Sequence, residues 1–128
     1  MRVAVDSNRY TDLCRGEARA VDVVTSADEI YMPLIVIAEQ RAGFAFGSKQ
    51  AENEANLTRF LNTEGVYVLA PDEQTTHVYA QVYAGLRRRG TPIPTNDIWI
   101  AALAIQHDLL LFDRDSDFDY VPNLARLK

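Results

Sequence analysis

The sequence has few of the residues that cross-link or anchor a small protein. Its single cysteine, Cys14, cannot pair within the chain, so an internal disulfide and a paired-cysteine zinc site are both excluded. The longest uninterrupted apolar stretch, Ile98 to Ile105, is far shorter than the roughly 20 residues needed to cross a bilayer. Asp6 interrupts the first apolar run before a secretory signal segment could form. These absences predict a cytoplasmic protein held together by its apolar core.

Positive charge is also scarce, and only two lysines, Lys49 and Lys128, are present. Thirteen basic and eighteen acidic side chains give a net charge of −5, the wrong sign for binding nucleic acid through bulk charge. Any contact with nucleic acid must therefore be local. The 128 residues, 48% hydrophobic and 24% charged, are typical of one globular domain, which we expect to span residues 1–128.

Apolar periodicity and turn residues predict five short strands separated by helices. The expected strands are Arg2 to Val5, Ile30 to Met32, Val66 to Leu69, Leu109 to Phe112 and Leu124 to Leu127. The expected helices are Asn8 to Leu13, Glu17 to Ala27, a mostly buried Leu34 to Phe46, Ser48 to Asn62, Asp72 to Arg89, and Thr95 to His107. Right-handed crossovers between such strands predict a three-layer α/β sandwich with a mostly parallel five-stranded sheet.

Four carboxylates interrupt or border this hydrophobic structure: Asp6, Glu39, Asp97 and Asp115. Ligands of parallel sheets bind at the carboxyl ends of the strands, where Asp6 and the Asp113 to Asp117 segment are expected. A buried carboxylate without a partner is costly, and the sequence offers few compensating bases nearby, of which Arg9 and Arg41 are candidates. A bound divalent cation is the simplest way to compensate the charge.

The chemistry of the cation follows from the donor atoms. Carboxylate oxygens without histidine or cysteine form a hard site that suits one or two Mg²⁺ or Mn²⁺ ions rather than zinc. Such ions support phosphoryl chemistry. Two of them would cancel a site charge of −4 and bring the net charge from −5 towards −1, which would make a polyanionic substrate acceptable.

Each carboxylate also has a purely structural interpretation. Asp6 could be only a helix cap, and Asp97 could be an acidic residue favoured by the dipole of its helix. Glu39 could pair with Arg41, and the acidic residues from Asp113 to Asp119 could form a solvated turn. No single position decides between the two interpretations, but the shared placement at strand ends favours a site.

Four segments carry more specific motifs. They are Val5-Asp6-Ser7-Asn8, Ile35 to Glu39 followed by Arg41 and Gly43, Ile93 to Ala102 followed by His107, and Asp113 to Phe118. With these motifs the chain resembles the PIN-domain ribonucleases, and within them the VapC toxins of bacterial toxin-antitoxin pairs, over essentially its whole length.

The resemblance implies a metal-dependent endoribonuclease in which Asp6, Glu39, Asp97 and Asp115 hold Mg²⁺ or Mn²⁺ and activate water. It implies supporting roles around the metal for Ser7, Asn8, Asn96, Asp113 and Asp117. It also implies an RNA substrate, for which transfer RNA is one candidate, a VapB-like antitoxin and a homodimer. Asp113 departs from the family pattern, which usually has threonine there, and Asp117 stands where histidine or aspartate is common.

A few arginine side chains would make the contacts with RNA phosphates. Arg87 and Arg88 belong to the run Arg87-Arg88-Arg89, where positive charge is also favoured by the helix dipole, while Arg9 and Arg114 lie nearer the proposed ligands in sequence. We expect Arg9, Arg87, Arg88 and Arg114 to be the candidates.

Other classes of function fit less well. An aspartyl phosphotransferase needs a second aspartate where Asn8 stands, and a signalling receiver domain needs a lysine after its last strand that neither Lys49 nor Lys128 supplies. A catalytically silent PIN-like module that binds RNA or protein stays open, because Asp113 departs from the family pattern.

Overall fold

The computed structural model describes all 128 residues and has a five-stranded parallel sheet at its centre. The strands are β1 (Arg2–Val5), β2 (Glu29–Pro33), β3 (Val66–Leu69), β4 (Leu110–Phe112) and β5 (Arg126–Leu127), in the spatial order β3-β2-β1-β4-β5. Every pair of neighbours is parallel, with Val3 of β1 beside Ile30 of β2 on one side and Leu110 of β4 on the other. The predicted fold class is confirmed.

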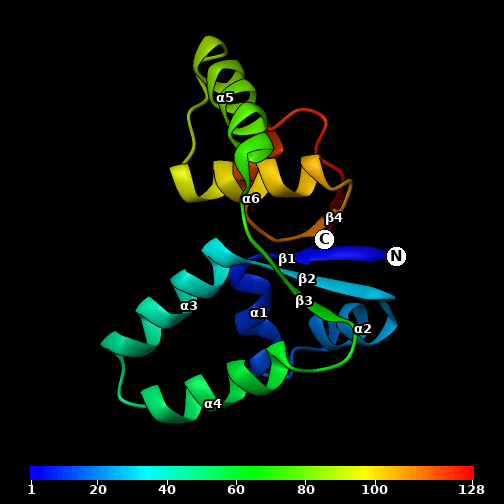
Figure 1. The fold of residues 1–128 in the computed structure, drawn as a ribbon, viewed down its shortest axis with the longest axis vertical. Coiled ribbons are helices and arrows are strands. Elements are labelled where there is room, and N and C mark those ends of the chain that lie inside the picture. The colour runs from blue at the N-terminus through cyan, green and yellow to red at the C-terminus, as the bar shows by residue number, and fades with distance from the viewer.

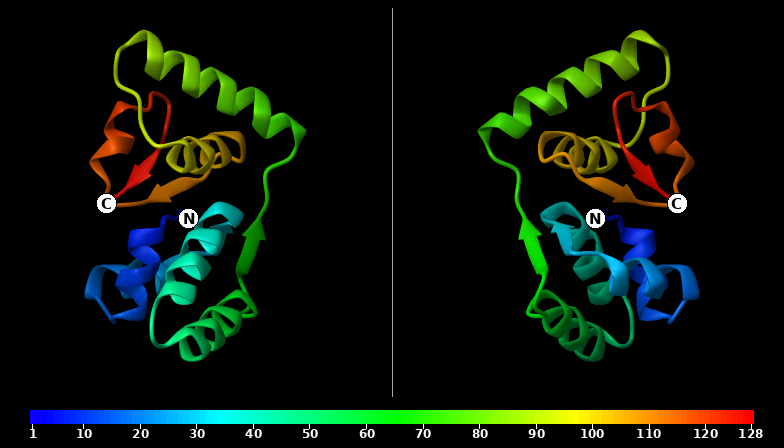
Figure 2. Two further views of the ribbon diagram at one scale, coloured as in Figure 1. Left: turned by 90° about the vertical axis from the view of Figure 1, so that its left-hand side faces the viewer. Right: turned by 90° about the vertical axis from the view of Figure 1, so that its right-hand side faces the viewer.

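Six helices cover the two faces of the sheet. They are α1 (Ser7–Cys14), α2 (Ala18–Ser26), α3 (Leu34–Phe46), α4 (Gln50–Leu61), α5 (Glu73–Arg88) and α6 (Thr95–Gln106). Helices α1 to α4 lie on one side of the sheet, and α5 and α6 lie on the other (Figure 1). Figure 2 shows α5 crossing over α6, far from α3 and α4. No helix is both long and apolar enough to span a bilayer.

Much of the core comes from β1, β4 and α6, and buried residues of α2, β2, α3, α4 and α5 add to it. Val3, Ala4 and Val5 are fully buried because β1 is a central strand covered on both faces. Every residue of α6 from Ile100 to Ala104 is also buried, since this helix lies between the sheet and α5. The apolar sequence of α6 thus reflects burial on all sides.

The order of the strands places the end of β1 beside the end of β4. The chain leaves β1 towards β2 and β3 in one direction and returns to β4 on the opposite side, so β1 marks the point at which the strand order reverses. Val5 pairs with Phe112, and the backbone N–H of Asp6 donates to the carbonyl oxygen of Phe112 at 3.1 Å. Ligands of open parallel sheets bind at this kind of position.

One local prediction was wrong. The helix predicted to be mostly buried, α3, buries only Val36 and Ile37, while Leu34 is 45% and Phe46 98% exposed. The apolar residues of α3 lie on all sides of the helix, but the neighbouring elements cover only one of these sides. The acidic segment after β4 contains a short 3₁₀ helix, η1 (Ser116–Tyr120), and the last strand is only two residues long.

Candidate metal centre

Asp6 directly follows β1 and is the N-cap residue of α1, but its side chain makes no capping hydrogen bond. The carboxylate is therefore not explained by capping. It is 4% exposed, and burial raises its pKa to about 7, with repulsion from Glu39, Asp113 and Asp115 acting in the same direction. A carboxylate with this pKa is only about half ionised at pH 7, and a bound cation would favour the ionised form.

Asp97 lies in the first turn of α6, on the opposite face of the sheet from α1. It is 9% exposed, and burial raises its pKa to about 7 as well. Repulsion from Asp115, Asp6 and Asp117 adds to the effect of burial. The charge of Asp6, which follows β1, is thus among the causes that raise the pKa of Asp97 on α6.

Three of the carboxylates form a compact group. Asp97, Asp115 and Asp117 each offer an oxygen, and these oxygens all lie within 4.8 Å of one another. The Oδ1 atom of Asp115 accepts the backbone N–H of Asp117 at 2.9 Å, which orders the start of η1. Asp117, expected to support the site, therefore offers an oxygen within the cluster itself.

Glu39 is held at the site by α1. Its Oε1 atom accepts a hydrogen bond from the hydroxyl of Ser7 at 3.1 Å. The amide Nε2 of Gln40 donates to the carbonyl oxygen of Ser7 at 3.1 Å and to the hydroxyl of Thr11 at 3.3 Å. Ser7 thus contacts a candidate ligand, and Gln40, which was not predicted, links α3 to α1 behind it.

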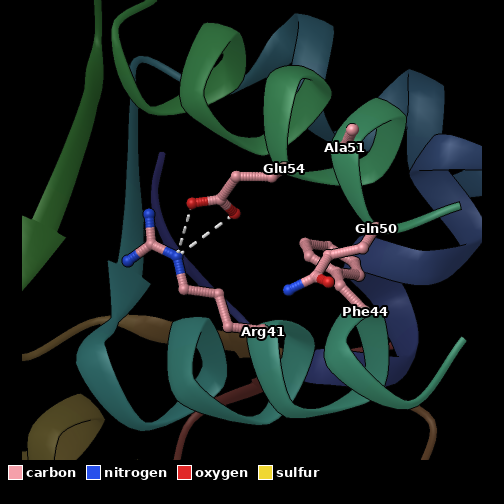
Figure 3. Close-up of a pocket in the computed structure, with 5 residues that line it drawn as sticks. All are labelled: Arg41, Phe44, Gln50, Ala51 and Glu54. Atoms are coloured by element: carbon pink, nitrogen blue, oxygen red, sulfur yellow. Dashed lines mark hydrogen bonds and ion pairs between the residues drawn. The ribbon is translucent and has the colours of Figure 1, made fainter.

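None of the carboxylates of Asp6, Glu39, Asp97, Asp115 and Asp117 takes part in an ion pair. Arg41 pairs instead with Glu54 across the space between α3 and α4, with Nε donating at 3.0 Å and 3.2 Å (Figure 3). The alternative in which Arg41 neutralises Glu39 is therefore wrong. These side chains remain without a protein cation.

Arg9 and Arg114 are both engaged by Asp12. Arg114 donates from Nε and Nη2 to the two carboxylate oxygens at 2.8 Å and 3.1 Å, while Arg9 lies 3.4 Å from Oδ2 of Asp12 and 3.5 Å from Oε2 of Glu17. The Arg9 guanidinium also lies over the ring of Phe112, and its side chain is only 11% exposed. Arg9 is therefore poorly available to a phosphate, whereas Arg114 remains half exposed.

Asp113 is fully buried, and its carboxylate pairs with the guanidinium of Arg126 on β5. Its charge is compensated inside the protein, unlike that of Asp6 or Asp97. Asn8 and Asn96 are exposed at the starts of α1 and α6 and make no side-chain hydrogen bond. Sequence reasoning did not predict Gln40, Asp12 or Arg126, and no motif or spacing signalled them.

The arrangement fits a hard divalent cation. The donors are carboxylate oxygens, no histidine or cysteine lies among them, and burial penalises their charge without a compensating base. The donor atoms of this group are therefore those of a divalent-metal site.

Comparison with known proteins identifies the family. The family model for the PIN domain matches residues 3–124. The chain belongs to the PIN-domain family. This PIN domain is 34% identical over 110 residues to Ribonuclease VapC1 of Haemophilus influenzae (strain R2866), an alignment that covers 80% of this chain and 81% of VapC1. It is 25% identical over 91 residues to Ribonuclease VapC4 of Mycobacterium tuberculosis, covering 71% and 70% of the two chains.

A solved structure shares the whole fold. The structure of VapBC-1 from nontypeable Haemophilus influenzae matches this PIN domain with a TM-score of 0.88 and 24% identity, over 100% of this chain and 98% of that one. This structure confirms the fold, while the family model and the similarity to VapC1 confirm the predicted family.

Proposed function

We propose that this protein is a metal-dependent endoribonuclease toxin, built as a single PIN domain over residues 1–128 and neutralised by a cognate antitoxin. One observation carries the proposal. Buried or half-buried carboxylates that form no ion pair lie together near the ends of β1 and β4, where the strand order reverses. The VapC names of its relatives support ribonuclease activity.

Asp6, Glu39, Asp97 and Asp115 are the proposed metal ligands, and Asp117 is close enough to take part. When bound, one or two Mg²⁺ or Mn²⁺ ions would lower the pKa of a water ligand and offset charge on the phosphate oxygens. Ser7 holds the Glu39 carboxylate by its hydrogen bond, and Asn8 and Asn96 stand exposed at the rim, free to contact the substrate. The hydrophobic environment of Asp6 and Asp97 strengthens their attraction for the ion.

The silent-module alternative depended on Asp113 as an unusual extra acid near the metal. Because Arg126 pairs with that carboxylate, the extra charge does not require a loss of activity. We therefore favour the enzyme.

An antitoxin would exploit the same unpaired charge. We propose that a VapB-like partner inserts an arginine or lysine among the carboxylates and so replaces the charge of the metal. This partner and the RNA substrate would meet the protein in the cytoplasm. A homodimer is also proposed, and the exposed side chains of Leu34, Tyr67 and Val68 offer apolar surface for it.

The direct test is cleavage of cellular RNA by purified, antitoxin-free protein in Mg²⁺ and in excess chelator. The proposal expects discrete fragments with Mg²⁺ or Mn²⁺ and none with chelator, and a purified transfer RNA pool tests that candidate substrate. Fragments that persist in chelator, or a well-folded protein that cleaves no RNA in either metal, would argue against the proposed function.

Arg87 and Arg88 give a separate prediction about RNA binding. Both lie in the last turn of α5, and Arg87 lines a small cavity together with Thr95, two residues before Asp97. Replacing both by glutamine should weaken RNA binding and reduce the slope of log K against log salt by about 0.7 for each lost phosphate contact. Filter binding in Ca²⁺ across a salt series measures this.

The matched control for that pair is Arg59→Gln on the exposed side of α4, where the guanidinium contacts only Asn56. It should bind RNA as the wild type does. An unchanged salt slope in the Arg87→Gln/Arg88→Gln variant would remove these residues from the RNA interface and leave the helix dipole as their explanation.

A further inference from the structure

The last strand brings one arginine into the acidic segment that follows β4. Arg126 donates from Nε to Oδ2 of Asp113 at 3.0 Å and from Nη2 to Oδ1 at 2.6 Å. This two-pronged pairing uses the planar fork that a lysine lacks. The Arg126 side chain is 14% exposed and that of Asp113 is fully buried, so the pair forms part of the interior.

The same guanidinium contacts two further points of the segment. Its Nη2 donates to the backbone carbonyl oxygen of Asp115 at 3.2 Å, and its Nη1 pairs with the carboxylate of Asp119. Arg126 therefore touches residues 113, 115 and 119, which span the segment from the end of β4 into η1.

A line of hydrogen bonds continues from this pair to the candidate metal ligands. Oδ1 of Asp113 accepts the backbone N–H of Asp115 at 3.1 Å, and Oδ1 of Asp115 accepts the backbone N–H of Asp117 at 2.9 Å. Asp115 and Asp117 supply two of the three oxygens that lie within 4.8 Å of one another. Arg126 and Asp113 thus hold the backbone that positions the side chains of Asp115 and Asp117.

We propose that Arg126 is a positioning residue that, through Asp113, holds Asp115 and Asp117 in the arrangement that binds the metal. This rests on the proposed function. It assigns a use to Asp113, which replaces the usual threonine, and to an arginine only two residues from the C-terminal residue of the sequence. Groups that orient metal ligands from behind commonly change metal affinity by about 10- to 100-fold when removed.

Arg19 provides a matched control. Its Nε and Nη2 atoms both donate to the backbone carbonyl oxygen of Lys128, at 2.9 Å and 2.7 Å. Arg19 therefore holds the residue that directly follows β5, and it makes no hydrogen bond to the acidic segment. A variant at this position separates general anchoring of β5 from the orientation of Asp115 and Asp117.

The experiment measures Mn²⁺ affinity by electron paramagnetic resonance titration of the full chain, with circular dichroism to verify folding. Arg126→Gln is expected to weaken Mn²⁺ binding by about 10- to 100-fold. Arg19→Gln is expected to stay within about twofold of the wild type. Arg126→Lys keeps the charge but not the fork, so it should also lose about tenfold or more, and it serves as the test if the glutamine variant does not fold.

Affinity within twofold of the wild type in Arg126→Gln or Arg126→Lys would overturn the proposal, and so would an equal loss in Arg19→Gln. RNA cleavage by the same samples separates this result from a failure of the proposed function. If the wild type cleaves RNA with metal and the Arg126 variants match it in Mn²⁺ affinity, only the positioning role fails. If the wild type neither binds Mn²⁺ nor cleaves RNA, the proposed function fails as well.

Discussion

Replacing Asp97 by asparagine is expected to yield a protein that is more stable than the wild type and almost inactive. Asparagine keeps the size of the side chain but removes a charge that burial opposes. Because the pKa of Asp97 is raised from 3.8 to about 7, the metal-free variant should gain on the order of 2 to 4 kcal/mol at neutral pH.

The loss of activity should be large. Losing one metal ligand removes several kcal/mol of transition-state stabilisation, and each 1.36 kcal/mol is a factor of ten in rate, so cleavage should fall about a thousandfold or more. Asp6→Asn should behave in the same way, because Asp6 is also buried and its pKa is also raised to about 7.

Thermal unfolding and RNA cleavage on the same samples measure both effects. The gain in stability corresponds to a rise of roughly 10 °C in Tm for a domain of this size. Asp22→Asn on the exposed side of α2 is the control and should change stability by less than about 0.5 kcal/mol and cleavage not at all. An Asp97→Asn protein that is less stable than the wild type, or that cleaves RNA normally, would contradict the account of this residue.

The stability of the metal-free protein is expected to fall as the pH rises from about 4 to about 7. In this window the folded state keeps protons on Asp6 and Asp97, whose pKa values are raised to about 7, while the unfolded chain has already lost them. Stability decreases with pH wherever the folded state binds more protons than the unfolded state. Below about pH 4 both states are protonated at these positions, and above about pH 7 neither is, so the contribution is then constant.

The size of this effect follows from the same values. Each unit of raised pKa corresponds to about 1.4 kcal/mol, although the two groups repel each other and their contributions do not simply add. Bound Mg²⁺ should reverse the loss, by about 2.7 kcal/mol at a concentration 100 times its Kd. At pH 5 protons compete with the metal for these carboxylates, so the same Mg²⁺ concentration should stabilise the protein very little.

Urea unfolding between pH 4 and 8, with Mg²⁺ and with chelator, tests both statements. The Asp6→Asn/Asp97→Asn variant provides the control, since it lacks both groups and should show a flatter pH profile and no response to Mg²⁺. If the stability of the metal-free wild type instead rises from pH 5 to pH 7, burial of these two carboxylates does not dominate the pH dependence of stability.

Much of the site could be predicted because parallel sheets gather strand ends at one edge. Asp6 follows β1 directly and Asp115 lies just after β4, so the rule for strand ends placed both near that edge. Glu39 and Asp97 could be selected because they interrupt or border apolar helices, and the resemblance supported all four residues.

The supporting interactions could not be predicted because they join residues far apart in sequence. Arg114 and Asp12 are separated by 102 positions, and Gln40 contacts Ser7 across 33. Arg126 lies in β5, and this strand of two residues is too short for the sequence pattern to reveal that it pairs with β4. The helix α3 shows the same limit, because its apolar composition cannot reveal how much of its surface other elements cover.

Diffraction at the manganese absorption edge from a crystal soaked in Mn²⁺ tests the central claim most directly. The account predicts an anomalous peak bounded by Asp97, Asp115 and Asp117, with Asp6 beside it, and no such peak in a crystal of Asp97→Asn treated in the same way. A peak elsewhere on the protein, or none among these carboxylates in a soaked wild-type crystal at pH 8, would contradict it.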